Sequence, residues 1–218
     1  MNWLGIVVSY LYIGLILVGA KLFEKRGEEA SRKFIHIMLG NWWFIAMYFF
    51  SNVWFAIFVP ITFVIINYVS YKRNLIKVME REQQDGLGTV YYAIALLILA
   101  IVSFGIYHKP ELGLVPNLVM AYGDGFAAVV GKWIKSKTYK VGETTKTVAG
   151  SVTMFVISLV CIVSFLIIRY TFGVWQIALI GVVIAIVATI IEAISGKGID
   201  NISVPISVLV MLLMIEMI

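Results

Sequence analysis

Long apolar runs alternate with short polar connections along the whole chain. Eight of these runs approach or exceed the ~20 residues that a helix needs to cross a bilayer. They cover residues 3–22, 33–50, 53–71, 88–107, 112–131, 148–170, 172–194 and 201–218. The pattern predicts an all-α fold, a polytopic helical bundle of about eight transmembrane helices forming a single domain over residues 1–218. Charges follow the first run without a small-residue cleavage site, so we expect a transmembrane helix there and no cleaved leader.

The composition agrees with a membrane protein. Hydrophobic residues make up 61% of the chain and charged residues 13%, and the mean hydropathy is +0.98, which excludes an ordinary soluble domain. The net charge of +5 comes from basic residues between the apolar runs, so we expect contact with the bilayer and none with nucleic acid. The single cysteine, Cys161, excludes an intramolecular disulfide and argues against a cysteine metal site.

The basic residues predict the orientation of the bundle. With the amino terminus outside, fifteen of the seventeen lysines and arginines fall in the cytoplasmic connections, as the positive-inside rule requires. Only Lys109 and Arg169 remain for the opposite face. The fifteen are Lys21, Lys25, Arg26, Arg32, Lys33, Lys72, Arg73, Lys77, Arg81, Lys132, Lys135, Lys137, Lys140, Lys146 and Lys197.

An aspartate interrupts the fifth apolar run, in the segment Gly123-Asp124-Gly125. A carboxylate at membrane depth is costly, so Asp124 is a candidate functional residue. The two glycines allow another backbone or a ligand to approach closely. The alternative is a structural role, with Asp124 paired to a neighbouring lysine inside the bundle.

Basic residues open two of the other apolar runs. Helical spacing places Arg32, Lys33 and His36 on one face, where they serve either as an anchor at the membrane surface or as a contact for phosphate. Lys146 and Thr147 precede a predicted helix start, which favours phosphate through its backbone N–H groups and dipole. A plain capped helix is the alternative. Gly131-Lys132 has the wrong spacing from Gly125 for a P-loop.

Further polar residues flank the last connection. Glu192 ends the seventh run, and Asp200-Asn201 opens the eighth. Carboxylate and amide oxygens from separate helices, converging with Asp124, are the ligands that Mg²⁺ prefers. A helix cap by Asp200, or a path for protons or ions, is the alternative.

Taken in order, these motifs resemble the CTP-dependent lipid kinases, a family that includes phytol kinase, dolichol kinase and the yeast-type diacylglycerol kinase. The resemblance extends over nearly the whole chain from residue 31. It rests on Arg32-Lys33-x-x-His36, Gly123-Asp124-Gly125-x-Ala127 with Gly131-Lys132, Lys146-Thr147-x-x-Gly150-Ser151, and Glu192 with Asp200-Asn201-x-x-x-Pro205.

The resemblance implies transfer of the γ-phosphoryl group of a nucleoside triphosphate, usually CTP, to the hydroxyl of a membrane lipid alcohol: phytol, another isoprenol, a polyprenol or diacylglycerol. Mg²⁺ would assist, and positioning plus charge neutralisation would supply most of the catalysis. We expect these roles: catalytic, Asp124, Arg32, Lys33 and His36; nucleotide-binding, Gly123, Gly125, Gly131, Lys132, Lys146, Thr147, Gly150 and Ser151; metal-binding, Asp124, Glu192, Asp200 and Asn201.

Several alternatives stay open. The general base is either His36 or a carboxylate. A cytidylyltransferase that makes CDP-lipid would need the same magnesium carboxylates, and a secondary transporter would use Asp124 and Glu192 as coupling carboxylates. We expect an integral membrane protein, in the plasma membrane of a prokaryote, with its active site facing the cytoplasm. The lipid alcohol, the nucleotide base and the oligomeric state do not follow from the sequence.

Overall fold

The computed structural model describes residues 1–23, 27–73, 87–142, 144–196 and 198–217, apart from the side chain of Glu28. Five of the basic residues used to predict the orientation lie outside this part of the chain. They are Lys25, Arg26, Lys77, Arg81 and Lys197.

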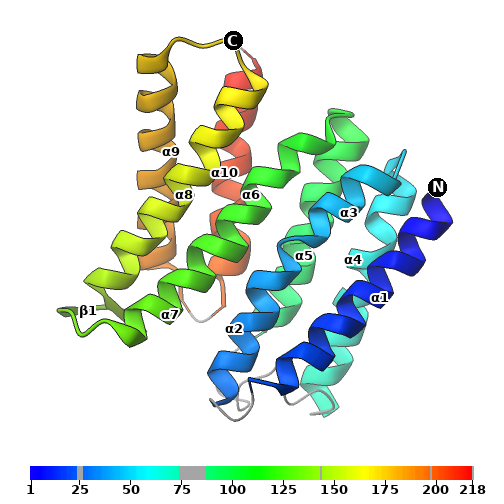
Figure 1. Cartoon of the computed structure of the whole chain (residues 1–218), viewed down its shortest axis with the longest axis horizontal. Coiled ribbons are helices and arrows are strands. Elements are labelled where there is room, and N and C mark those ends of the chain that lie inside the picture. Colours follow the sequence, from blue (N-terminus) through cyan, green and yellow to red (C-terminus); the bar gives the residue numbers. More distant parts are fainter. Residues whose placement is uncertain (24–26, 74–86, 143, 197, 218) are drawn as a thin grey trace.

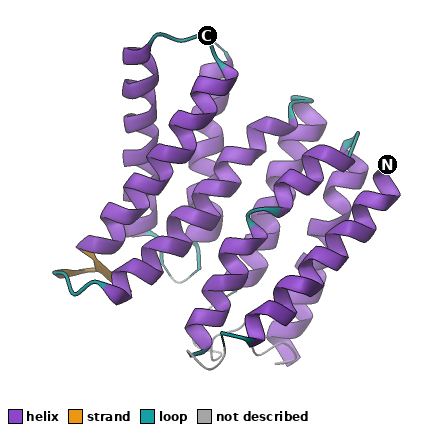
Figure 2. Ribbon diagram, in the orientation of Figure 1, coloured by secondary structure: helices purple, strands orange, loops and turns teal. Residues whose placement is uncertain are grey.

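Helices dominate the described residues, and one short hairpin accompanies them (Figures 1 and 2). The all-α class is confirmed. The elements are α1 (Asn2–Lys21), α2 (Glu28–Leu39), α3 (Trp42–Phe49), α4 (Val53–Arg73), α5 (Gly88–Ala100), η4 (Ile101–Ile106), η5 (Pro110–Gly113), α6 (Leu114–Leu118), η6 (Val119–Asp124), α7 (Gly125–Trp133), β1 (Thr138–Val141), β2 (Thr144–Thr147), α8 (Val148–Arg169), α9 (Val174–Ile194) and α10 (Asp200–Glu216).

Six helical segments in the described residues are long and apolar enough to cross a membrane. They cover Asn2–Lys21, Val53–Arg73, Gly88–Ile106, Pro110–Trp133, Val148–Arg169 and Val174–Ile194. The other two predicted spans correspond to shorter helices, namely α2 followed by α3, and the 17-residue α10. The total of eight spans and the outside position of the amino terminus stay predictions.

The second predicted span is divided in two. The sequence suggests one helix over residues 33–50, but α2 ends at Leu39 and α3 begins at Trp42. Side chains from the fifth run stabilise this break: Nδ2 of Asn117 donates to the carbonyl oxygen of Gly40 at 2.7 Å, and the Tyr122 hydroxyl donates to Oδ1 of Asn41 at 2.6 Å. Polar groups freed inside a membrane need such partners.

The polar motifs gather at one end of the bundle. The lower end of Figure 1 holds the last residues of four helices (α1, α4, α7 and α9) and the first residues of four others (α2, α5, α8 and α10). The hairpin β1–β2 lies there too. Three exposed tryptophans, Trp3, Trp54 and Trp175, lie near the start of α1, α4 and α9 at the other end. Tryptophan favours the interface between membrane and water, so the two ends of the bundle correspond to the two membrane faces.

Candidate functional site

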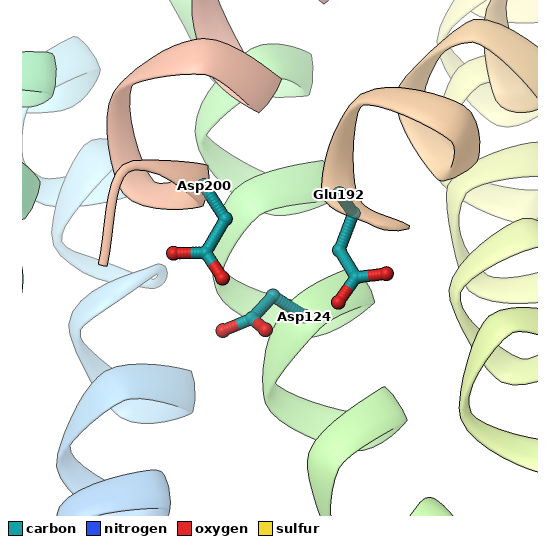
Figure 3. Close-up of side chains that lie close together, drawn as sticks. All are labelled: Asp124, Glu192 and Asp200. Atoms are coloured by element: carbon teal, nitrogen blue, oxygen red, sulfur yellow. The ribbon is translucent and has the colours of Figure 1, made fainter. Parts of the chain in front are cut away.

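Three carboxylates from different helices meet at the lower end of the bundle (Figure 3). Asp124, Glu192 and Asp200 each contribute an oxygen, and these oxygens all lie within 4.8 Å of one another. Asp124 and Glu192 are buried, with 8% and 4% exposure, and Asp200 is half-buried. The structure thus brings together three of the four predicted metal ligands, although they are up to 76 residues apart in the sequence (200 − 124).

Local backbone geometry places these carboxylates. Asp124 is the last residue of the π-helical turn η6, a feature found frequently at functional sites. Asp200 begins α10 two residues after Gly198, whose φ of +78° suits glycine. A Cβ atom on Gly198 would lie 2.7 Å from Cα of Gly88. Close contact between these two glycines therefore brings the start of α10 against the start of α5.

Two lysines face the carboxylates. Nζ of Lys33 donates to Oδ2 of Asp124 at 2.7 Å, and Lys146 donates to Glu192 and lies 3.8 Å from Oδ2 of Asp200. Lys146 is in the hairpin; burial lowers its pKa, but the charge of Glu192 and the hydrogen bond to it, with Asp200 and Asp124, outweigh burial and leave the pKa raised. Both lysines thus place an amino group beside the carboxylates, an arrangement suited to binding phosphate oxygens.

His36 lies in the same contact network. Its Nε2 atom is 3.1 Å from the carbonyl oxygen of Met120 and 3.3 Å from Oδ2 of Asp124. A carbonyl oxygen only accepts hydrogen bonds, so we assign the proton to Nε2. The Nε2 atom is then a donor and not a proton acceptor, which favours the carboxylate alternative for the general base. Sequence reasoning missed Tyr92, whose ring lies edge-on to that of His36 with 4.9 Å between the ring centroids.

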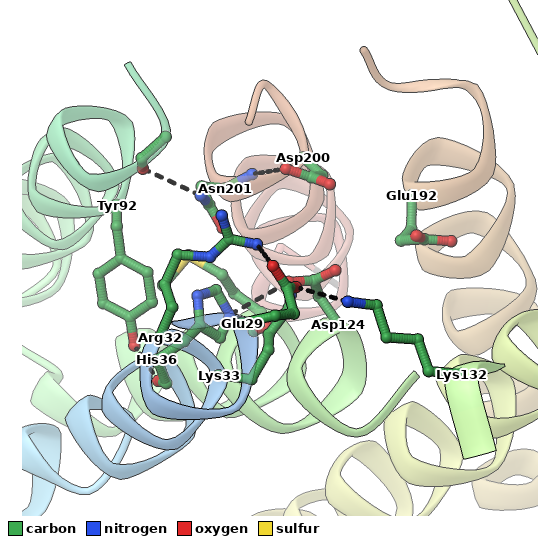
Figure 4. Close-up of polar contacts among 12 residues, drawn as sticks. Glu29, Arg32, Lys33, His36, Tyr92, Asp124, Lys132, Glu192, Asp200 and Asn201 are labelled. Atoms are coloured by element: carbon green, nitrogen blue, oxygen red, sulfur yellow. Dashed lines mark hydrogen bonds and ion pairs between the residues drawn. The ribbon is translucent and has the colours of Figure 1, made fainter. Parts of the chain in front are cut away.

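Glu29 was also missed by sequence reasoning. Its carboxylate pairs with Arg32 through Oε2 and lies 3.9 Å from Nζ of Lys132 through Oε1 (Figure 4). The 21–33 connection holds three glutamates among five basic residues, and no pattern singles out Glu29. Glu29 thus links two predicted site residues, Arg32 and Lys132, through its carboxylate.

The start of α8 is capped, with Thr147 as the N-cap residue. Oγ1 of Thr147 accepts from the backbone nitrogen of Gly150 at 3.0 Å, and Oγ of Ser136 accepts from that of Ala149 at 3.0 Å. The backbone nitrogen of Val148 donates to the carbonyl oxygen of Lys137 at 2.9 Å. The first three N–H groups therefore already have partners within the chain, and a phosphate here would meet Lys146 and the helix dipole.

The predicted nucleotide-binding glycines divide into two groups. A Cβ atom on Gly123 would lie 2.6 Å from Sδ of Met154, and one on Gly125 would collide with Ile37, so both serve close helix packing. Gly131 and Gly150 face each other between α7 and α8 and also line a cavity. Of the eight predicted residues, all but Gly123 and Gly125 line this cavity.

Two cavities of opposite character meet at the carboxylates. A polar cavity of about 370 Å³ extends towards the hairpin and α8, and an apolar cavity of about 150 Å³ extends between α2, α4 and α5. Both are lined by Lys33, Asp124, Gly198 and Asp200. We call these four residues the shared wall.

The donor set fits a magnesium ion. Besides the three carboxylates, Asn201 offers a buried Oδ1 atom that has no hydrogen-bond partner among the described residues, while its Nδ2 atom donates to the carbonyl oxygen of Gly88 at 2.9 Å. A buried carbonyl-type oxygen without a partner is costly. Oxygen ligands from carboxylate and amide groups suit Mg²⁺.

Comparison with known proteins identifies relatives. The chain is 31% identical over 209 residues to a phytol kinase of Synechocystis sp., covering 93% of this chain and 88% of the relative. It is 30% identical over 210 residues to probable phytol kinase 1, chloroplastic, of Oryza sativa subsp. japonica, covering 88% of this chain and 65% of that relative. No protein-family profile matches the chain, and no solved structure matches it. On the strength of the alignment to the cyanobacterial relative over most of both sequences, the chain belongs to the phytol kinase family.

Proposed function

We propose that the protein is a lipid-alcohol kinase that transfers the γ-phosphoryl group of a nucleoside triphosphate to an isoprenoid alcohol. The observation that carries this proposal is the shared wall, where the polar and the apolar cavity meet at Lys33, Asp124 and Asp200. A phosphoryl transfer needs a polar site for the donor, an apolar site for the acceptor chain and charges between them. The phytol kinases among the relatives support an isoprenoid acceptor.

The polar cavity is the proposed triphosphate site. Lys146 and Lys132 contribute positive charge to it, and Thr147, Gly150 and Ser151 lie at the start of α8. CTP is the proposed donor because of the resemblance to CTP-dependent lipid kinases. None of these contacts distinguishes a cytosine from an adenine base, so the transfer assay compares CTP with ATP.

Mg²⁺ is the proposed cofactor. Asp124, Glu192, Asp200 and Asn201 would hold it, and the ion would supply charge neutralisation for the triphosphate. Lys33 and Lys146 already contact two of these carboxylates. Both lysines would turn their charge towards the phosphate oxygens as the substrate enters.

The acceptor hydroxyl would lie against Asp124 on the apolar side of the shared wall. The carboxylate of Asp124 is the proposed proton acceptor, because Nε2 of His36 already carries a proton. His36 is a positioning residue that orients the carboxylate. Arg32 lines the apolar cavity beside the wall and contributes charge near the product phosphate.

The proposed orientation places this site on the cytoplasmic face of an integral membrane protein, where nucleoside triphosphates are available. Support comes from the basic residues at the lower end of the bundle, among them Lys21, Lys72 and Lys135. The plasma membrane is the proposed location in a prokaryotic cell.

A transfer assay with purified protein tests the function. Protein in detergent with Mg²⁺ and γ-labelled CTP or ATP should pass the label to phytol, geraniol or farnesol, whereas α-labelled nucleotide should leave the lipid unlabelled. Asp124→Asn should abolish transfer, and Glu111→Gln, at the other end of the bundle, should not. Label from the α-position in the lipid would instead show a cytidylyltransferase, and full activity of Asp124→Asn would overturn the site assignment.

A further inference from the structure

The apolar cavity extends a defined distance from the shared wall into the bundle. Asn67 of α4 donates from Nδ2 to the carbonyl oxygen of Thr89 on α5 at 3.0 Å, which sets these two helices in register near the wall. From there the lining residues continue along α4 to Val59 and along α5 to Leu96, towards the opposite end of the bundle. At a rise of 1.5 Å per residue, Val59 lies about 12 Å from Asn67 along α4, and Leu96 lies about 10 Å from Thr89 along α5.

The floor of this cavity is rigid. Trp42 lines it and is 1% exposed, and its Nε1 atom donates to Oγ of Ser9 at 3.0 Å. Phe63, which lines the cavity between Val59 and Asn67, stacks its ring on that of Tyr10 with 6.1 Å between the ring centroids and so joins α4 to α1. A side chain held by packing and a buried hydrogen bond does not move aside at low cost.

Shape decides which chain enters such a cavity. An acceptor tail arrives from lipid, which is as apolar as the cavity, so burial adds little driving force and steric fit sets the preference. An extended hydrocarbon chain advances about 1.2 Å per bond, so a depth of about 12 Å holds about ten bonds, or two to three isoprene units.

Resting on the proposed function, we propose that this cavity binds the hydroxyl-proximal isoprene units of the acceptor, and that its floor at Trp42, Val59 and Leu96 sets how deep the chain extends. The cavity is continuous with the shared wall through Lys33, Asp124 and Asp200, so a chain seated in it presents its hydroxyl to Asp124. Away from the shared wall its lining is mainly aliphatic and aromatic, which suits a methyl-branched hydrocarbon chain.

Blocking the cavity at two depths tests the proposal. Val59→Phe fills the floor. Ala93→Leu narrows the cavity four residues after Thr89 on α5, about 6 Å further from the wall. Val59→Phe should lower kcat/KM by about tenfold or more for farnesol and phytol, because the larger ring overpacks the floor, and should change the value for geraniol by less than about threefold. Ala93→Leu should lower it for geraniol as well. Leu179→Phe, on the exposed face of α9, is the matched control and should behave as wild type.

Labelling of the wild-type protein provides a second test that needs no variant. A farnesol analogue with a diazirine on its last isoprene unit should form adducts at Trp42, Val59 or Leu96, and unlabelled farnesol should suppress them. Adducts confined to α8 and α9, or the same chain-length profile in wild type, Val59→Phe and Ala93→Leu, would overturn the inference. If wild type phosphorylates no alcohol at all, the proposed function fails, whereas the labelling still reports whether the cavity takes the chain.

Discussion

Lys33 donates a hydrogen bond to Asp124 at 2.7 Å across 91 residues of sequence. Only 12% and 11% of the two side chains is exposed, so each charge depends on the other for compensation. The pair joins α2 to the end of η6 and lies at the shared wall. Its electrostatics therefore affect both the stability of the bundle and the proposed reaction.

We expect Lys33→Met to lower the free energy of unfolding by about 3–5 kcal/mol, because it leaves a buried carboxylate without its partner. Activity should be lost in the same variant. The double variant Lys33→Met with Asp124→Asn should recover much of the stability, since no buried charge remains, but no activity. Thermal unfolding in detergent and the transfer assay measure the two effects. Lys21→Met, at an exposed residue of the same end, is the control, and a stable, active Lys33→Met protein would contradict the pairing.

Substitution of each carboxylate should change the Mg²⁺ concentration that the reaction requires. We expect chelation by EDTA to abolish transfer, and Glu192→Gln or Asp200→Asn to raise the Mg²⁺ concentration for half-maximal activity by about tenfold or more, as loss of a charged ligand weakens such sites. Titration of activity with Mg²⁺ measures this. Glu111→Gln removes an acid at the opposite end and should leave the titration unchanged. An identical Mg²⁺ requirement in all variants would show that Glu192 and Asp200 do not bind the metal ion.

His36 should act by donating a hydrogen bond. His36→Gln keeps a side-chain N–H group, so we expect activity within about tenfold of wild type, whereas loss of a general base costs about 10²–10⁴-fold. His36→Leu lacks the donor and should lose more activity than His36→Gln. The pH–rate profile gives an independent readout, because the acid limb should persist in His36→Gln. A flattened limb would instead assign proton transfer to His36.

Hydropathy predicted most of the fold, because each span is a run of apolar residues with polar ends. The break between α2 and α3 was not predictable, since it depends on Asn117 and Tyr122 from a distant segment. The structure also explains the two exceptions in the charge distribution. Lys109 pairs with Glu216, and Arg169 lies 3.4 Å from Glu111. Both basic residues of the opposite end thus lie beside carboxylates, while the orientation of the bundle stays a prediction.

The site was predictable as a set of residue types but not as a set of contacts. Asp124 and Glu192 stood out because carboxylates are costly in apolar runs. Glu29 and Tyr92 belong to the same network through contacts that only folding creates. The depth of the apolar cavity likewise depends on the register of α4 against α5, which no local pattern encodes.

The close approach of α7 to α8 gives a last prediction. A Cβ atom on Gly131 would lie 2.5 Å from Oγ1 of Thr147, the atom that caps α8. Gly131→Ala should therefore displace this cap, lower the free energy of unfolding by about 1 kcal/mol and raise the KM for the nucleotide, because both residues line the polar cavity. Gly14→Ala has open space around the new methyl group and should stabilise α1 by about 0.5–1 kcal/mol without altering the KM. Equal melting temperatures and KM values for the two variants would show that the glycine at position 131 is not needed for the approach.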